Sequence, residues 1–250
     1  MEYRNLGASG LRLSELSFGS WVTFNKQVDH KQAEAMFGTC FDAGINFFDN
    51  AEGYEAGQSE IVMGKALKRL QVDYLDLYFC HRADPQTPIG ETVWAMHNLV
   101  TQGKILYWGT SEWTAEEITQ AYEFARENHL TAPTMEQPQY NLLDRERFEV
   151  EYGPLYETYG MGTTTWSPLA SGALTGKYLD GVPADSRASL PGYEWLRKHM
   201  VESERGQERM ARVARLKTIA DELGVSLSRL AIGWCLLNQN VSTVILGASR

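Results

Sequence analysis

YLDLYFC (residues 74–80), IGETVWAMHNLVTQG (89–103) and ILYWGT (105–110) follow one another along the chain. The first and third runs are short, apolar and rich in aromatic and β-branched residues, which is typical of buried strands. The middle run has the apolar spacing of an amphipathic helix and ends at a glycine, a common residue just past a helix C-terminus. A strand, a helix and a second strand in this order favour an α/β fold with parallel strands.

The same alternation continues on both sides of this unit. Further strand candidates are LSFGS (16–20), INFFD (45–49), TMEQP (134–138), TTTWSP (163–168) and STVILG (242–247). Helical periodicity occurs in HKQAEAMFGTCFDAG (30–44), in TAEEITQAYEFAREN (114–128) and twice between residues 209 and 238. Residues 3–13 place glycine turn residues between two short segments, so they predict a β-hairpin before the alternating pattern. The pattern therefore predicts seven parallel strands after a hairpin.

Composition limits the classes of function. The chain has 250 residues, 43% of them hydrophobic, which predicts one globular domain over residues 1–250. Its formal net charge of −9 argues against a nucleic-acid partner. No run approaches the ~18 apolar residues of a membrane span and no signal peptide is evident, so we expect a cytoplasmic protein without a membrane partner. Three widely spaced cysteines indicate neither a disulfide framework nor a metal site.

Residues 171–208 form a long stretch that contains glycine and proline and lies between two strand candidates. Compact α/β proteins prefer short connections, and long ones are often functional. Two interpretations remain open: this stretch covers a ligand, or it is a solvated insertion.

Three titratable residues fall at or just after predicted strand ends. Asp49 ends INFFD, Tyr54 follows five residues later, and His81 follows YLDLYFC. Barrel enzymes of parallel strands keep their active sites at this face of the sheet. Taken singly, Asp49 could cap a helix, Tyr54 could pack in a loop, and His81 could be a satisfied polar residue at the rim. Together they predict a site at one mouth.

Motifs along nearly the whole chain resemble one family. They are YRNLGASGLRLSEL (3–16), GSWVTF (19–24), GINFFDNAEGYEAGQSE (44–60), YLDLYFCHR, LYWGTSEW, TTTWSPLASGALTGKY, SRASLPGYEWL, LAIGWCL and VILGAS. This sequence resembles the aldo-keto reductases, most closely the branch of the voltage-gated potassium channel β subunits and their bacterial relatives. The resemblance implies a (β/α)8 barrel with an N-terminal hairpin, NADP(H) as cofactor, and reduction of small aldehydes or ketones to alcohols.

The resemblance also implies catalytic roles. Asp49, Tyr54 and His81 match three of the four catalytic positions of the family, with Tyr54 as the proton donor. A tyrosine with an ordinary pKa of about 10 needs a nearby cation to lose its proton readily. The family supplies a lysine within a TK or SK strand end, on the strand after the Asp/Tyr segment. No such strand end lies between Gly64 and Asp73, where Lys65 and Lys68 belong to the helical run GKALKRL. If that lysine is truly deleted, catalysis should nearly vanish.

The strand count points the same way. An eight-stranded barrel requires one more strand than the seven candidates found here, so one βα unit is expected to be absent. STVILGASR has no helix after it to cover its outer face, so the C-terminal helix is expected to be absent as well.

The resemblance assigns the cofactor site, since the GxGxxG fingerprint of a dinucleotide-binding Rossmann fold is lacking. Ser111 and Gln137 are expected to bond the nicotinamide amide, and Lys177 and Arg187 to lie near the phosphates. The full set of expected cofactor residues is Trp21, Gln27, Asp49, Ser111, Gln137, Trp166, Ser167, Pro168, Leu169, Ala170, Ser171, Lys177, Arg187, Gly247, Ser249 and Arg250. Glu112 departs from the Asn or Arg usual after that serine.

Substrate and partners are less constrained. Trp21, Tyr54, His81 and Trp113 are expected to contact the substrate, although the tryptophans could simply pack at the mouth. Relatives in this branch form tetramers or octamers, so a homo-oligomer is expected. The alternative function is an NADP(H)-binding, redox-sensing regulatory subunit of a potassium channel. His81 favours the enzyme, because the animal β subunits have asparagine there, and so does the lack of an N-terminal extension before YRNLG.

Overall fold

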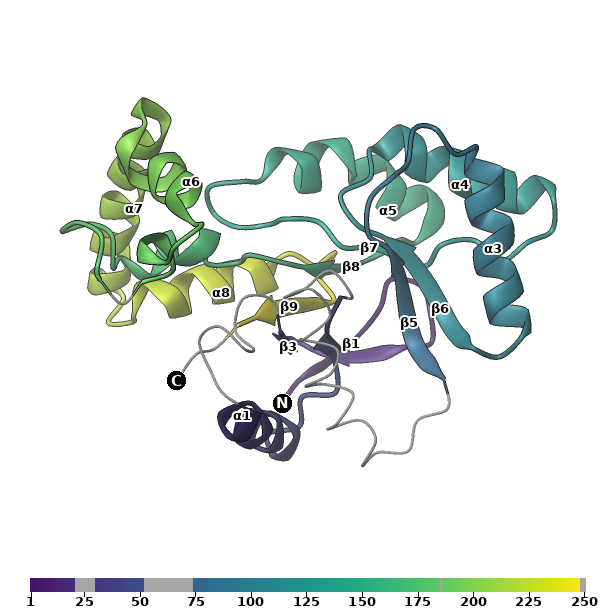
Figure 1. Ribbon diagram of the computed structural model, residues 1–250, viewed down its shortest axis with the longest axis horizontal. Helices are drawn as coiled ribbons and strands as arrows, with labels where there is room; N and C mark the ends of the chain where they lie inside the picture. Colours follow the sequence, from purple (N-terminus) through teal and green to yellow (C-terminus); the bar gives the residue numbers. More distant parts are fainter. Residues whose placement is uncertain (21–29, 52–73, 185, 248–250) are drawn as a thin grey trace. The chain divides into compact units, whose positions relative to one another are not determined.

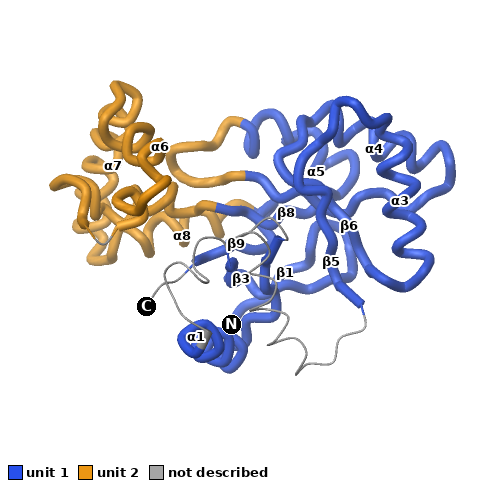
Figure 2. The backbone as a smooth tube through the Cα atoms, in the orientation of Figure 1, with its two compact units in different colours: residues 1–138, 147–166, 239–250 blue, residues 139–146, 167–238 orange. Residues whose placement is uncertain are grey.

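A computed structural model describes residues 1–20, 30–51, 74–184 and 186–247 (Figure 1). The chain divides into two compact units (Figure 2). The first unit comprises residues 1–138, 147–166 and 239–250, and the second comprises residues 139–146 and 167–238. Each unit is considered by itself below, and the single domain expected over residues 1–250 stays a prediction.

The expected N-terminal hairpin is confirmed. Strands β1 (Tyr3–Asn5) and β2 (Arg12–Ser14) pair antiparallel. The turn between them packs against the chain before strand β8, where the Ala8 N–H donates to the Gly160 carbonyl oxygen at 2.8 Å. Gly7 has φ +54°, and a Cβ there would lie 2.2 Å from that same oxygen. Both the backbone conformation and the close approach therefore require glycine at this position.

All seven expected parallel strands are present, and several are shorter than the apolar runs that predicted them. Their bounds are β3 (Leu16–Gly19), β4 (Phe48–Asp49), β5 (Leu75–Cys80), β6 (Ile105–Thr110), β7 (Met135–Glu136), β8 (Gly162–Thr165) and β9 (Thr243–Leu246). They form one sheet in the order β4-β3-β9-β8-β7-β6-β5. Every neighbouring pair is parallel.

This sheet curls, and β4 and β5 are its two edges. Gln137, just after β7, donates to the Asp49 carboxylate of β4 at 3.1 Å, although three strands lie between β7 and β4 in the sheet. No strand in the described ranges pairs with the outer side of β4 or β5. The (β/α)8 barrel that the resemblance implies is thus confirmed in part, as a curled seven-stranded parallel sheet. Its opening lies where the sequence predicts an absent βα unit.

Helices of the first unit cover the outer face of this sheet (Figure 1). Their bounds are α1 (His30–Asp42), α3 (Ile89–Thr101), α4 (Ala115–Glu127), the π-helix η2 (Arg147–Glu151) and α5 (Gly153–Tyr159). A core of fully buried side chains joins α3, α4 and β6 through Val93, Ile118 and Trp108. A second core inside the sheet contains Leu6 and Met135, so the hairpin lies against the interior of the sheet.

The second unit has its own core. Its helices are the 3-10 turns η3 (Ala170–Thr175) and η4 (Arg187–Ser189), α6 (Glu194–Arg197), the π-helix η5 (Lys198–Glu202), α7 (Glu204–Glu222) and α8 (Leu227–Leu237). Leu174 and Tyr178 are buried against α7 and α8 side chains such as Val213 and Ala231. The interpretation of residues 171–208 as a solvated insertion is therefore wrong, because they bury apolar side chains. Their role as a ligand cover stays a prediction.

A buried ion pair ties α7 to residues 139–146 of the same unit. Arg209 is 6% exposed, and its two terminal nitrogens donate to the Asp144 carboxylate at 2.8 and 2.7 Å. Burial raises the pKa of Asp144, but the hydrogen bonds and charge of Arg209 outweigh burial and hold it below its ordinary value. The Arg209 guanidinium has little contact with water, so the Asp144 carboxylate supplies the countercharge that stabilises its positive charge.

Replacing Asp144→Asn is expected to lower the free energy of unfolding by about 3 kcal/mol, because it leaves a buried guanidinium without its countercharge. Urea unfolding followed by circular dichroism measures this loss. The matched control is Lys217→Met, which breaks the exposed α7 pair between Lys217 and Asp221 and should cost less than about 1 kcal/mol. Equal losses in the two variants would show that burial of Arg209 adds nothing to the pair.

In the part of the chain that the structure describes, no helix is both long and apolar enough to cross a membrane.

Candidate active site

The C-terminal ends of the strands bring Asp49 and Gln137 together. Asp49 is the last residue of β4 and is 8% exposed, and Gln137 follows β7 and is 6% exposed. The Gln137 amide nitrogen donates to Asp49 Oδ1 at 3.1 Å and to Thr164 Oγ1 of β8 at 3.2 Å. Burial raises the pKa of Asp49 to about 6, and the hydrogen bond from Gln137 opposes that rise. Asp49 is therefore a carboxylate above about pH 6.

No cation of the described ranges forms an ion pair with Asp49. The ion pairs of those ranges, from Arg4 to Lys217, all involve other carboxylates. A buried carboxylate without a cationic partner is disfavoured by desolvation, which is the cause of its raised pKa.

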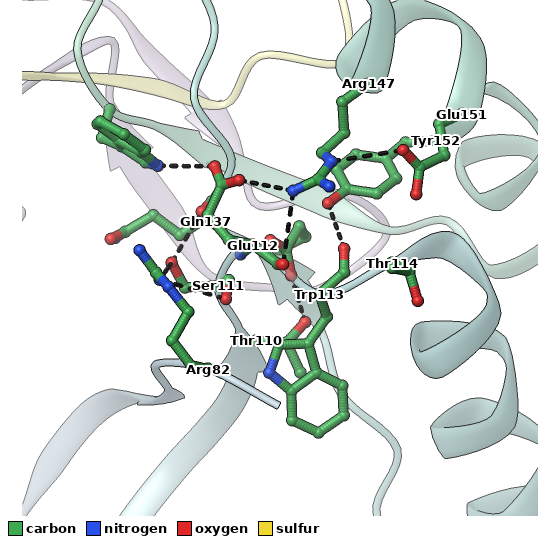
Figure 3. Close-up of polar contacts among 12 residues, drawn as sticks. Arg82, Thr110, Ser111, Glu112, Trp113, Thr114, Gln137, Arg147, Glu151 and Tyr152 are labelled. Atoms are coloured by element: carbon green, nitrogen blue, oxygen red, sulfur yellow. Dashed lines mark hydrogen bonds and ion pairs between the residues drawn. The ribbon is translucent and has the colours of Figure 1, made fainter. Parts of the chain in front are cut away.

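Ser111, the first residue after β6, lies beside this pair. Its hydroxyl donates to the Gln137 carbonyl oxygen at 3.0 Å, and its N–H donates to the Cys80 carbonyl oxygen at 3.1 Å. An Arg82 terminal nitrogen donates to Ser111 Oγ at 3.3 Å and to the His81 carbonyl oxygen at 2.5 Å. These hydrogen bonds join the segments that follow β5, β6 and β7 at the C-terminal ends of the strands. Figure 3 shows Arg82, Ser111 and Gln137 together.

His81 follows β5 and is exposed. Partial burial and the positive charge of Arg82 lower its pKa from the ordinary 6.5. The neutral imidazole is therefore favoured at pH 7, and a neutral imidazole retains one N–H donor.

A buried carboxyl group lies behind the loop that follows β6. Glu136, the last residue of β7, is fully buried and accepts hydrogen bonds from the Thr110 hydroxyl and the Glu112 N–H. Burial raises the pKa of Glu136 to about 8, and these hydrogen bonds oppose the rise. The nearby Glu112 carboxylate raises it further. The Glu136 carboxyl group is therefore mostly protonated at pH 7.

A second glutamate holds the same loop from its other side. Glu112 accepts a hydrogen bond from Arg147 at 2.6 Å, which Figure 3 shows. It accepts another from the Trp166 indole nitrogen at 3.0 Å. Arg147 also pairs with Glu151 at 3.3 Å. The departure of Glu112 from the usual Asn or Arg is thus accommodated by an ion pair from η2.

Several expected site residues lie outside the described residues: Trp21, Gln27, Tyr54, Ser249 and Arg250. Gly247 follows β9 and is exposed. Trp113 is 2% exposed and packs in the core with α4, which supports a packing role, and its contact with substrate stays a prediction.

The second unit carries the residues expected at the cofactor's phosphates. Ser167, Ala170 and Ser171 have φ of 55°, 47° and 54°, so the backbone of residues 167–171, which include Pro168 and Leu169, is tightly coiled. The Ser171 N–H donates to Ser167 Oγ at 3.1 Å. Lys177 is exposed and its ammonium lies 5.1 Å from the Tyr178 ring centroid, while burial lowers the pKa of Arg187, which stays cationic. A phosphate role for these residues stays a prediction.

Sequence patterns missed Arg82, Glu136, Arg147 and Thr164 as parts of this site. A usable signal existed for Glu136 alone, because a carboxylate inside a buried strand is rare and usually has dedicated partners. Arg147 gave no such signal, since an arginine in a helical, charge-rich segment is typical of a solvated surface.

Among the residues with described positions, no group of three or more His, Cys, Asp or Glu side chains is arranged to hold a metal ion.

Comparison with known proteins gives two findings. The model of the "Aldo/keto reductase family" matches residues 15–69 and 65–250. A "Probable voltage-gated potassium channel subunit beta" of Oryza sativa subsp. japonica is 46% identical over 292 residues, covering 100% of this chain and 88% of its own length. A protein of the same description from Arabidopsis thaliana is 45% identical over 292 residues, with the same coverage.

The comparisons also indicate an interruption in the chain. The aligned length of 292 exceeds the 250 residues of the chain by 42, so the relatives carry residues that have no counterpart here. The two segments of the family match meet at residues 65–69, between edge strands β4 and β5 of the sheet. A length of about 40 residues suits one βα unit, which needs about 30 or more. The strand count, the sheet order and the two segments of the family match therefore indicate the same place, and the alignments add only the extra length.

Proposed function

The chain belongs to the aldo/keto reductase family, and from this premise we propose that it reduces small aldehydes or ketones with NADPH. The observation that carries the proposal is the buried array of Asp49, Gln137 and Ser111 at the C-terminal ends of β4, β7 and β6. Such ends form the active-site face in barrels of parallel strands.

The array suits a nicotinamide carboxamide. Within the described residues, both side-chain hydrogen bonds of Gln137 are donated by its Nε2, which leaves Oε1 as an acceptor. The Ser111 hydroxyl donates its hydrogen to the Gln137 carbonyl and can accept through its oxygen. Two acceptors close together can receive the two N–H groups of a carboxamide. Lys177, Arg187 and Arg250 are the basic residues we assign to the phosphates, and they favour NADP(H) over NAD(H).

Three residues of the chain are assigned to the reaction. Bound NADPH supplies the hydride. Tyr54 donates the proton to the carbonyl oxygen, and His81 in its neutral form donates a hydrogen bond to the same oxygen. Asp49, ionised above about pH 6, is held by Gln137. Lys65 and Lys68 belong to the predicted helical run GKALKRL, and no strand end with the family's lysine lies between Gly64 and Asp73, so we expect the turnover to be slow.

The test measures oxidation of NADPH by absorbance over a panel of small aldehydes and ketones. Tyr54→Phe is expected to lower the rate by about 100-fold, the lower end of what a general acid contributes. Tyr74→Phe is the matched control, because Tyr74 is 44% exposed and lies before β5, and it should keep the wild-type rate. Equal rates for wild type and Tyr54→Phe would mean that Tyr54 is not the proton donor.

The second candidate function is an NADP(H)-binding regulatory subunit of a potassium channel. The observation that favours it is the description of the rice and Arabidopsis relatives as probable channel β subunits. Tight binding of NADPH with no turnover on any carbonyl of the panel would support this function over the enzyme.

A further inference from the structure

The loop between β6 and α4, residues 111–114, contains one residue in a strained conformation. Glu112 has φ +58°, the left-handed region that favours glycine. A glutamate has no local hydrogen bond of the kind that lets Asn or Asp adopt this region. Such a conformation persists only where the surroundings hold it, and it occurs often at functional sites.

The side chain of Glu112 is anchored at both of its oxygens. Oε2 accepts from Arg147 at 2.6 Å, and Oε1 accepts from the Trp166 indole nitrogen at 3.0 Å. The Glu112 side chain is 18% exposed and that of Glu151 is 36% exposed, so the pair of Arg147 with Glu112 is more sheltered than its pair with Glu151. Figure 3 shows the contact between Arg147 and Glu112. The anchors fix the side chain and so hold the backbone from which it extends.

The backbone of the loop is held as well. The Glu112 N–H donates to buried Glu136, and the Tyr152 hydroxyl donates to the Trp113 carbonyl at 2.5 Å. At the start of α4, the Ala115 N–H donates to the Glu151 carboxylate at 2.9 Å. Residues immediately after Ser111 therefore have partners on both sides of the loop.

Ser111 is joined directly to the strained residue. Its hydroxyl is directed to the Gln137 carbonyl at 3.0 Å, in the array described above. Rotation at the next residue would change the direction of the Ser111 carbonyl and of the loop that follows it. We propose that Glu112 is a positioning residue for NADP(H): its anchored side chain holds the loop in the conformation that presents Ser111 to the cofactor. This inference rests on the proposed function.

The test compares Glu112→Ala with Glu112→Gly by titrating NADPH and following its fluorescence. Alanine loses both anchors yet must still adopt a positive φ, so the dissociation constant should rise about tenfold. Glycine also loses the anchors but takes a positive φ without steric penalty, so it should recover most of that affinity. Glu116→Ala is the control, because Glu116 is exposed in the first turn of α4 and contacts Gln120 at 3.3 Å.

Other outcomes contradict the inference. Equal affinities for the alanine and glycine variants would mean that backbone conformation at this position does not matter for binding. Tighter binding in both would mean that Glu112 acts as a charge that repels the phosphates. Arg147→Met should weaken NADPH binding, as Glu112→Ala does. An unchanged affinity would show that the contact between Arg147 and Glu112 is not needed to position the loop.

Hydrogen exchange without cofactor separates this inference from the proposed function. The amides of residues 112–115 should exchange faster in Glu112→Ala than in wild type or Glu116→Ala. If wild type fails to bind NADPH, the proposed function is wrong, and exchange still decides whether Glu112 holds the loop. If wild type binds NADPH while exchange and affinity are the same in Glu112→Ala, the inference alone is wrong.

Discussion

Insertion between positions 65 and 69 of a βα unit that carries the family's lysine is expected to raise the rate of carbonyl reduction at least about 100-fold. The reason is electrostatic. The resemblance places a lysine on the strand after the Asp/Tyr segment, and a cation there stabilises Tyr54 as it loses its proton. The buried Asp49 carboxylate without such a cation has the opposite effect on a neighbouring phenol.

The measurement is the steady-state rate with the most reactive aldehyde of the panel. The control is the same insertion with its lysine replaced by methionine, which adds the same strand but not the charge. Both insertions should raise the midpoint of urea unfolding, because an added strand can pair with β4 and β5. A rate that rises equally in both would show that the scaffold, and not the cation, limits turnover.

Replacing Glu136→Gln is expected to make the protein more stable at alkaline pH. The folded pKa of Glu136 is about 8 and its ordinary value is 4.5, so between these values the folded protein holds a proton that the unfolded chain has released. The wild-type free energy of unfolding should therefore fall as pH rises from 4.5 to 8, by roughly 1.4 kcal/mol per unit. A glutamine keeps an acceptor for the Glu112 N–H and a donor for Thr110, and it does not ionise.

Urea unfolding at pH 5, 7 and 9 measures this effect. The difference between Glu136→Gln and wild type should be small at pH 5 and reach several kcal/mol at pH 9. Glu123→Gln, on the exposed face of α4, should follow the wild-type curve. Glu136→Leu should lose stability at every pH, because the Glu112 N–H is then buried without a partner. Parallel curves for wild type and Glu136→Gln would contradict a buried, protonated carboxyl group.

The strands were predictable because each is a short apolar run between turn residues. The order of the sheet and its opening between β4 and β5 follow from counting those runs and from the parallel connections. Strand ends were less predictable: TMEQP gives only Met135–Glu136, because Pro138 has no N–H for a ladder and the chain turns to place Gln137.

Asp49 was predicted from its position at the end of a strand, whereas Ser111 and Gln137 were predicted only from the family resemblance, and the roles of all three stay predictions. The contacts that hold the site were not predictable, because they join residues far apart in the chain. Arg147 reaches Glu112 across 35 residues, and Trp166 reaches it across 54. No periodicity in the sequence reports such a pair. The core of residues 171–208 was missed for a different reason: it is built from 3-10 turns and short helices, whose apolar residues have no regular spacing.

The open edge of β5 also affects how the protein behaves at high concentration. Leu75 and Tyr78 are 49% and 41% exposed, and β5 pairs with β6 on one side, while the described part of the chain offers no strand to its other side. An unpaired, apolar edge is a template for strand pairing between molecules, the first step of β-aggregation. Asp76 is exposed between these two residues, and a charge at that position opposes stacking of one copy on another. We therefore expect Asp76 to disfavour strand pairing between molecules, a role separate from folding and from catalysis.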